Sequence, residues 1–321
     1  MSAEERSVAV AAEPPTRASW LRRAITWAFY AAVAVVLVAY VARIDFASLA
    51  SIRIGWHYLA LALVAGLGQR LLIPLVWVLM LRSLGVKVRR YASFNFVYAK
   101  AWLGRYVPGK VAMVAARVYF ADELGASRSV IAISSVAEIG AYLLVTGAVS
   151  LLGVASIAGS NDAIAPYLPL TYGFIAALAV LLWPPIFNGL MRLLFKLFRR
   201  PTADMPMVTA RTLAWAVAGF LVVSVMTGVL AVLLAASVDP VAFDHAFFVW
   251  GAYSLASVLG MAFVFTPSGI GAREAIQLPL FALVVSPEAA VAIALVSRVA
   301  ELAADALFYG VSALWSRLAA R

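Results

Sequence analysis

The 321-residue chain is 65% hydrophobic and only 12% charged, with a mean hydropathy of +0.98, which excludes an ordinary soluble domain. It has no cysteine and two histidines, so disulfides and thiolate metal sites are excluded and we expect no cofactor. Its net charge of +10 comes from basic residues at the ends of apolar stretches. That pattern is typical of membrane topology and not of nucleic-acid binding.

In chain order, residues 1–19 are polar and are predicted to form a disordered N-terminal segment. Arg22 and Arg23 precede an apolar stretch without a convincing cleavage site, so we expect a retained span there. Six stretches are long and apolar enough to cross a bilayer, namely 24–42, 56–81, 129–155, 170–191, 212–237 and 289–315. Two more, 91–126 and 246–286, are apolar but broken near the middle, which predicts re-entrant hairpins or pairs of short spans.

The distribution of Lys and Arg predicts the orientation. Four precede the first span, four follow the second, five lie between the fourth and fifth, and two end the chain. The opposite loops carry only Arg43 and Arg53. The basic side should be cytoplasmic, which makes the protein a multi-pass protein of the cell membrane with both termini inside.

Each half of the chain contains three predicted spans and one broken hairpin. We divide the chain into a first half, 20–160 with its hairpin at 91–126, and a second half, 161–321 with its hairpin at 246–286. An odd number of spans per half predicts an inverted-topology repeat. Val136–Ile139 also resembles Val299–Leu302, although such a match is often chance in an Ala/Val-rich chain.

The join between the halves is basic. Residues 186–200 mix large apolar side chains with Arg192, Lys196, Arg199 and Arg200, a pattern that suits an amphipathic helix at the inner leaflet. The alternative is that this segment is simply the basic end of the fourth span.

Two motifs interrupt the hairpins, Arg105–Lys110 (RYVPGK) and Thr266–Glu274 (TPSGIGARE). Each puts Pro and Gly beside cationic side chains and is followed by an apolar segment that can form a helix. A helix N-terminus and guanidinium groups both favour phosphate or carboxylate. The motifs therefore predict an anion site, and its candidate residues are Arg105, Pro108, Gly109, Lys110, Pro267, Gly269, Gly271 and Arg273.

Further charges fall within the predicted spans. They are Arg70, Glu138, Arg298 and Glu301, with Asp305 on the same helical face as the last two and Glu274 next to Arg273 as a candidate orienting partner. Glu138 and Glu301 are candidates to carry protons as a driving ion, or to hold the arginines in place. The i,i+3 spacing of Arg298 and Glu301 also permits a local ion pair.

The same motifs resemble the transmembrane region of lysylphosphatidylglycerol synthases. Arg105–Lys110 with Arg117, Gly125 and Glu138 looks like one signature of that family, and Pro267–Glu274 with Arg298 looks like the second. The resemblance covers about residues 20–315 and implies a lipid flippase, with Arg117 as a further candidate headgroup contact. The chain ends at Arg321, soon after the last predicted span, so we do not expect the family's aminoacyl-transferase domain or its synthase activity.

Three functions compete at this point. The leading one is a flippase for an anionic lipid, such as a phospholipid, an aminoacyl-phospholipid or a polyprenyl-phosphate-linked sugar. The second is a secondary transporter of a small organic anion, because it would share the same architecture. A membrane enzyme is third, since Asp45 is the one acidic residue available in the first outer loop to hold a metal. We therefore expect no enzymatic activity, a membrane lipid as partner, and an oligomeric state that the sequence leaves open.

Overall fold

The structure is a computed structural model that describes residues 52–106, 111–162, 164–197, 207–262 and 271–320. Within these ranges every regular element is helical, as the composition predicts. The α-helices are α3 (Trp56–Ser83), α4 (Tyr91–Trp102), α5 (Val111–Tyr119), α6 (Arg128–Ala155), α7 (Leu168–Leu181), α8 (Pro184–Leu197), α9 (Ala210–Ala236), α10 (Ala246–Ala262), α11 (Ala272–Phe281) and α12 (Pro287–Leu318). Short 3-10 helices are η1 (Leu103–Tyr106), η2 (Asp122–Leu124), η3 (Ala165–Tyr167) and η4 (Pro240–Phe243).

Among the described residues three helices, α3, α6 and α9, are long and apolar enough to cross a membrane. They correspond to the predicted spans 56–81, 129–155 and 212–237. The 32-residue α12 covers the predicted span 289–315 but carries three charged residues in its middle. The predicted span 24–42 lies outside the described residues.

The prediction of one continuous span over 170–191 is wrong. The segment consists of α7 and α8, which meet at 82° and would count as a fourth span if the bent pair crosses the bilayer together. The bend falls at Pro184 and Pro185, because proline lacks the backbone N–H that an uninterrupted helix needs but fits the first turn of a new one.

Helix α8 has the amphipathic character predicted for 186–200. Phe187 and Met191 are buried, whereas Arg192 and Lys196 are exposed. The Asn188 side chain accepts from the Val208 backbone N–H at 2.9 Å and donates to the Val208 carbonyl at 2.8 Å. These bonds fasten α8 to the residue that precedes the first turn of α9. Its contact with a membrane leaflet stays a prediction.

Side-chain caps define where three long helices begin. The hydroxyl groups of Ser127, Thr209 and Ser286 each accept a hydrogen bond from a backbone N–H in the first turn, of α6, α9 and α12 respectively. Ser and Thr favour this position because they satisfy a donor that the helix leaves unpaired. Local sequence therefore fixes these starts.

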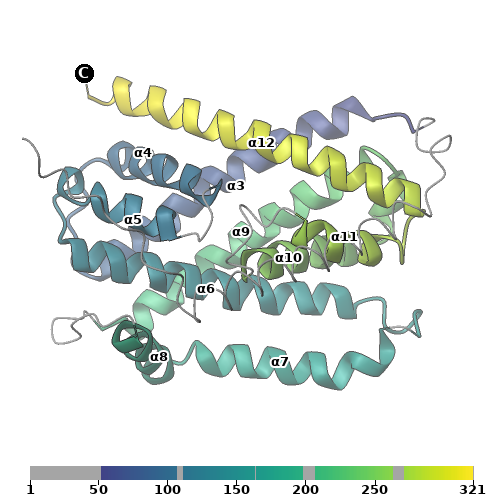
Figure 1. The fold of residues 1–321 in the computed structure, drawn as a ribbon, viewed down its shortest axis with the longest axis horizontal. Helices are drawn as coiled ribbons and strands as arrows, with labels where there is room; N and C mark the ends of the chain where they lie inside the picture. Colours follow the sequence, from purple (N-terminus) through teal and green to yellow (C-terminus); the bar gives the residue numbers. More distant parts are fainter. Residues whose placement is uncertain (1–51, 107–110, 163, 198–206, 263–270, 321) are drawn as a thin grey trace, which may run out of the picture.

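Helices α4 and α5, from the predicted hairpin 91–126, lie at the left of the molecule, and α10 and α11, from the predicted hairpin 246–286, lie from its centre toward the right (Figure 1). Helix α3 packs along α9 in the centre, α10 packs on α6, and α12 packs on α4. One apolar cluster surrounds Trp77, Tyr98 and Phe220, and a second surrounds Phe248 and Phe281. Each hairpin therefore has its own apolar cluster.

Two glycines allow a close contact between the backbones of α6 and α10. A Cβ added to Gly251 would lie 2.6 Å from Gly153 Cα, and one added to Gly153 would lie 2.6 Å from the Phe247 carbonyl oxygen. Backbone atoms cannot move aside as flexible side chains can. Small residues are the usual means by which membrane helices approach one another, because lipid tails compete for ordinary apolar contacts.

We expect Gly251→Ala to lower the free energy of unfolding in detergent by about 1–3 kcal/mol, through overpacking against α6. The control is Gly173→Ala on α7, where an added Cβ meets nothing within 4 Å. Thermal unfolding monitored by circular dichroism measures both. Equal stability of the two variants would contradict the close contact.

Candidate functional site

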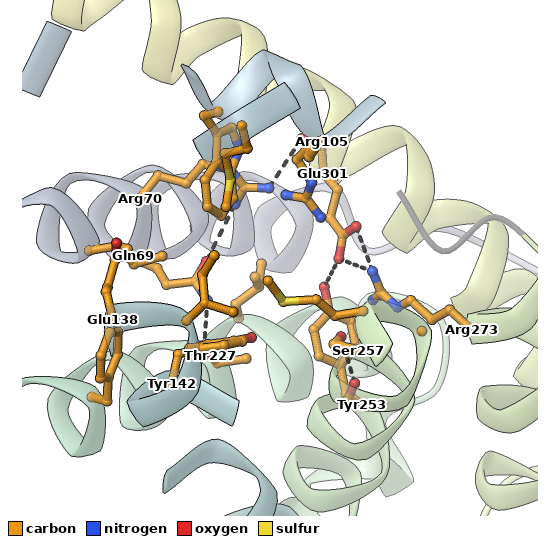
Figure 2. A pocket seen from close by; sticks show the side chains of 18 of the residues that line it. Gln69, Arg70, Arg105, Glu138, Tyr142, Thr227, Tyr253, Ser257, Arg273 and Glu301 are labelled. Atoms are coloured by element: carbon orange, nitrogen blue, oxygen red, sulfur yellow. Dashed lines mark hydrogen bonds and ion pairs between the residues drawn. The ribbon is translucent and has the colours of Figure 1, made fainter. Parts of the chain in front are cut away.

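A cavity of about 120 Å³ lies between the two hairpins, lined by residues of α3, α4, η1, α5, α6, α9, α10, α11 and α12 (Figure 2). Its charged lining residues are Arg70, Arg105, Glu138, Arg273 and Glu301. The volume is that of several water molecules, since one water needs about 10–15 Å³ on this scale. Residues far apart in the sequence, from Arg70 to Glu301, therefore contribute charges to one cavity.

Asp305 on α12 joins three elements of the first half. It accepts from Arg70 Nε at 2.5 Å, Trp102 Nε1 at 3.0 Å and the Tyr106 hydroxyl at 2.5 Å. Arg105 Nη1 lies 3.7 Å from its Oδ2 atom. Arg70 also donates to the backbone oxygens of Gly66 and Glu301. This Asp305 cluster fixes α12 against α3, α4 and η1.

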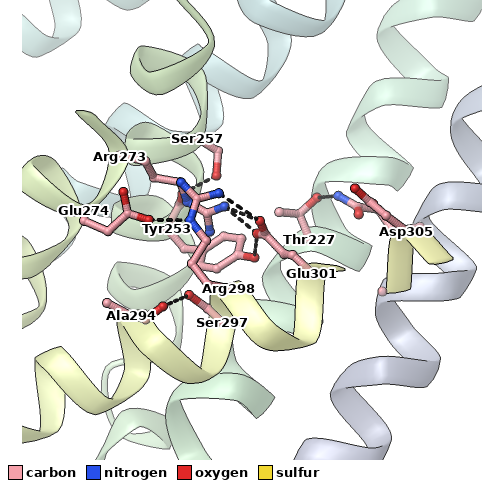
Figure 3. Close-up of polar contacts among 12 residues, drawn as sticks. Thr227, Tyr253, Ser257, Arg273, Glu274, Ala294, Ser297, Arg298, Glu301 and Asp305 are labelled. Carbon is pink, nitrogen blue, oxygen red and sulfur yellow. Dashed lines mark hydrogen bonds and ion pairs between the residues drawn. The ribbon is translucent and has the colours of Figure 1, made fainter. Parts of the chain in front are cut away.

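The second hairpin contains a Tyr–Arg–Glu arrangement, which we term the second triad (Figure 3). Arg273 Nη1 on α11 donates to both oxygens of Glu301 on α12, at 2.5 and 2.6 Å. The Tyr253 hydroxyl on α10 donates to Glu301 Oε1. The Arg273 guanidinium lies 4.4 Å from the centre of the Tyr253 ring, in cation–π range.

The first hairpin contains the same arrangement, which we term the first triad. Arg117 Nη1 on α5 and the Tyr98 hydroxyl on α4 both donate to Glu138 on α6. The Arg117 guanidinium lies 3.9 Å from the centre of the Tyr98 ring. In both triads the Tyr precedes the break, the Arg follows it, and the Glu is on the next long helix.

The Glu274 side chain accepts two hydrogen bonds at the start of α11. Its Oε1 atom accepts from Arg298 Nε at 2.5 Å, and its Oε2 atom accepts from the Gly271 backbone N–H at 2.7 Å. Gly271 has a φ of +81°, a conformation that favours glycine. The predicted orienting partner of Arg273 therefore pairs with Arg298 instead. The predicted Arg298–Glu301 pair is present as a longer contact of 3.9 Å.

The structure brings together part of the predicted anion site. Arg105 and Arg273 line the cavity and Gly271 begins α11, whereas Arg117 is fully buried in the first triad and does not line the cavity. Pro108, Gly109, Lys110, Pro267 and Gly269 lie outside the described residues. Of the predicted charge network, Arg70, Glu138 and Glu301 line the cavity, and Glu274 and Arg298 form a pair beside it.

Sequence reasoning missed Trp102, Tyr106 and both triad tyrosines, and it did not assign Asp305 to the site. The repeated Val-Ala-Glu at 136–138 and 299–301 was the available signal, because its two glutamates are the acids of the two triads. Asp305 is four residues after Glu301, one helical turn away. The tyrosines had no comparable signal.

The site is close to electrically balanced. Its described part contains five arginines, and each is within 4.0 Å of one of four carboxylates. Arg70 and Arg105 share Asp305, so one positive charge is in excess. An arriving anion would therefore meet arginines that already have carboxylate partners. Within the same ranges, no group of three His, Asp or Glu side chains is placed to hold a metal.

These features define a multi-pass helical membrane protein with a charged internal cavity. The family model described as "Lysylphosphatidylglycerol synthase TM region" matches residues 24–308. The chain belongs to that family, a membrane domain associated with lipid-related, flippase-like function. A search of curated proteins returns no match.

We expect Asp305→Ala to destabilise the protein by about 3–5 kcal/mol, because it leaves a buried arginine without its counter-charge. Adding Arg70→Met should recover part of that loss, since the pair is then replaced by apolar side chains. Chemical unfolding of Asp305→Ala, Arg70→Met and the double variant in detergent gives the coupling free energy between the two side chains. Strictly additive losses would contradict the ion pair.

Proposed function

We propose that the protein is a flippase that moves an anionic lipid between the two leaflets. The candidate lipids are a phospholipid, an aminoacyl-phospholipid or a polyprenyl-phosphate-linked sugar. The observation that carries the proposal is the cavity between the hairpins, which Arg70, Arg105 and Arg273 line among apolar helices. Charged groups at such depth usually mark a substrate path. Membership of a flippase-associated membrane family supports it.

In this proposal the headgroup phosphate binds in the cavity on Arg105 and Arg273, while the hydrocarbon tails remain in the bilayer. Guanidinium groups suit a phosphate because their planar N–H groups match its oxygens. The protein carries the lipid and performs no covalent chemistry on it. Lys110 of the first motif is a further candidate contact.

The two halves are proposed to form an inverted-topology repeat of six spans and two re-entrant hairpins. The pattern of helix contacts supports this, since α4 packs on α12 just as its counterpart α10 packs on α6. The equivalent triads support it as well. Such repeats place a substrate site at their interface and expose it to each side in turn.

The proposed location is the cell membrane, with both termini in the cytoplasm. The loop between α3 and α4 and the exposed face of α8 carry the basic residues expected on that side. A single introduced cysteine is a clean probe of sidedness, because the chain has none of its own.

We expect Lys87→Cys, in the α3–α4 loop, to be protected from a membrane-impermeant maleimide in intact cells, whereas Asp244→Cys, before α10, is labelled. Both side chains are exposed in the structure. Lysed cells, in which both cysteines should react, provide the control. Labelling of both from outside would contradict the inverted repeat.

The transport test uses proteoliposomes with labelled phosphatidylglycerol, phosphatidylethanolamine and a polyprenyl phosphate. We expect selective translocation of one anionic lipid, reduced at least about tenfold by Arg105→Ala or Arg273→Ala, because each loses a charge-assisted contact worth about 1.5–3 kcal/mol. Arg128→Ala is the matched control, since Arg128 is exposed and pairs with Asp122 away from the cavity.

A small organic anion is the alternative substrate. The compactness of the cavity favours it, because about 120 Å³ would hold a small anion entirely. Uptake of such an anion by folded protein that moves no lipid would establish the secondary transporter and contradict the flippase.

A further inference from the structure

The second triad leaves most of the Arg273 guanidinium unused. Both bonds to Glu301 come from the single nitrogen Nη1. The Nε and Nη2 atoms have no hydrogen-bond partner among the described residues, although Arg273 is only 4% exposed. Buried unsatisfied donors are costly and rare in folded proteins. Since Arg273 lines the cavity, its free donors mark a place for acceptor oxygens.

Glu301 has a second cation within reach. Arg298 Nη1 lies 3.9 Å from Glu301 Oε2, and Arg298 Nη2 also has no partner in the described structure. Arg298 and Glu301 are one turn apart on α12. The Glu301 carboxylate therefore lies within 4.0 Å of two arginines, Arg273 and Arg298 (Figure 3). The carboxylate can therefore leave Arg273 without losing its counter-charge, while the Tyr253 hydroxyl remains a donor to it.

The first triad shares the unused donors, since Arg117 Nε and Nη2 also have no partner among the described residues, but it differs in two other respects. Arg117 is 0% exposed and does not line the cavity. Among the described ion pairs, Glu138 has Arg117 as its sole cation. The acid of the first triad consequently has no second arginine to receive it. Of the two triads, only the second has an arginine that lines the cavity and a second cation for its glutamate.

We propose that Glu301 is a displaceable counter-anion. When a phosphate-bearing headgroup enters the cavity, the Glu301 carboxylate moves from Arg273 to Arg298, and phosphate oxygens take its place on Arg273. When the headgroup leaves, the carboxylate returns. The step breaks and forms hydrogen bonds only and transfers no proton. This inference rests on the proposed function, and it assigns the anion-exchanging residue of that site.

The exchange has a consequence for affinity. In the resting site Glu301 competes with the ligand for Arg273, which weakens binding and assists release. A neutral side chain of the same shape removes the competitor. Glu301→Gln should therefore bind an anionic headgroup more tightly and translocate it more slowly, whereas a purely structural role would predict weaker binding.

The first experiment measures binding of dihexanoyl phosphatidylglycerol to the detergent-solubilised full chain by isothermal titration calorimetry. We expect Kd to fall by about tenfold in Glu301→Gln, equivalent to about 1.4 kcal/mol. The matched control is Glu123→Gln, the same change at an exposed carboxylate that pairs with Lys100 and does not line the cavity, which should not tighten binding. Unchanged or weaker binding by Glu301→Gln, equal tightening by both variants, or no binding by any form would overturn the inference.

A second pair of variants tests the transfer to Arg298 independently of Glu301. Arg298→Gln removes the receiving cation and should raise Kd for the same probe by about fivefold or more, whereas Arg298→Lys retains the charge and should bind within about twofold of the unaltered protein. Equal Kd values for the unaltered protein and both Arg298 variants would overturn the proposed movement of the Glu301 carboxylate to Arg298.

These binding readouts are separate from the transport assay. If the affinities change as expected but proteoliposomes move no lipid, the flippase proposal fails and the exchange at Arg273 stands. If lipid moves but Glu301→Gln does not tighten binding, the flippase proposal stands and the exchange fails.

Discussion

Pairing of buried guanidinium groups is the constraint on which this architecture depends. Arginine stays protonated in proteins, so a buried Arg must be neutralised by another element. Arg70 on α3 is paired with Asp305 on α12, and Arg117 on α5 with Glu138 on α6. Apolar packing alone specifies helix contacts weakly in a membrane, because lipid offers equivalent contacts. The ion pairs therefore select which helices adjoin.

The position of the cavity follows from these pairs. Each hairpin packs into its own apolar cluster, around Tyr98 in one half and Tyr253 in the other. The phenol hydroxyl groups of the same tyrosines donate to the triad glutamates, so each ring covers apolar surface while its hydroxyl faces the charges. The polar ends of both clusters consequently meet at one place, which is where the cavity lies.

Hydropathy predicted the long helices closely, since α3, α6 and α9 begin and end within two residues of the predicted spans. It failed at 170–191, because an average over the window ignores Pro184 and Pro185, which bend the chain. The site arginines were found because charge is rare in apolar sequence. The role of Asp305 was not found from the sequence, because its bond to Arg70 joins residues 235 positions apart. Tyr98 and Tyr253 gave no signal, since tyrosine is common in membrane helices.

The difference between Arg70 and Arg273 explains how one site can be both stable and exchangeable. All three Arg70 nitrogens donate to oxygens, so any movement of this side chain would break several bonds. Arg273 donates through one nitrogen only. A transporter must bind its substrate and also release it, which a permanently unpaired cation in a low-dielectric site would oppose. A carboxylate that alternates between two arginines keeps the empty site near neutrality. The incoming anion then binds Arg273 only moderately more strongly than the carboxylate does.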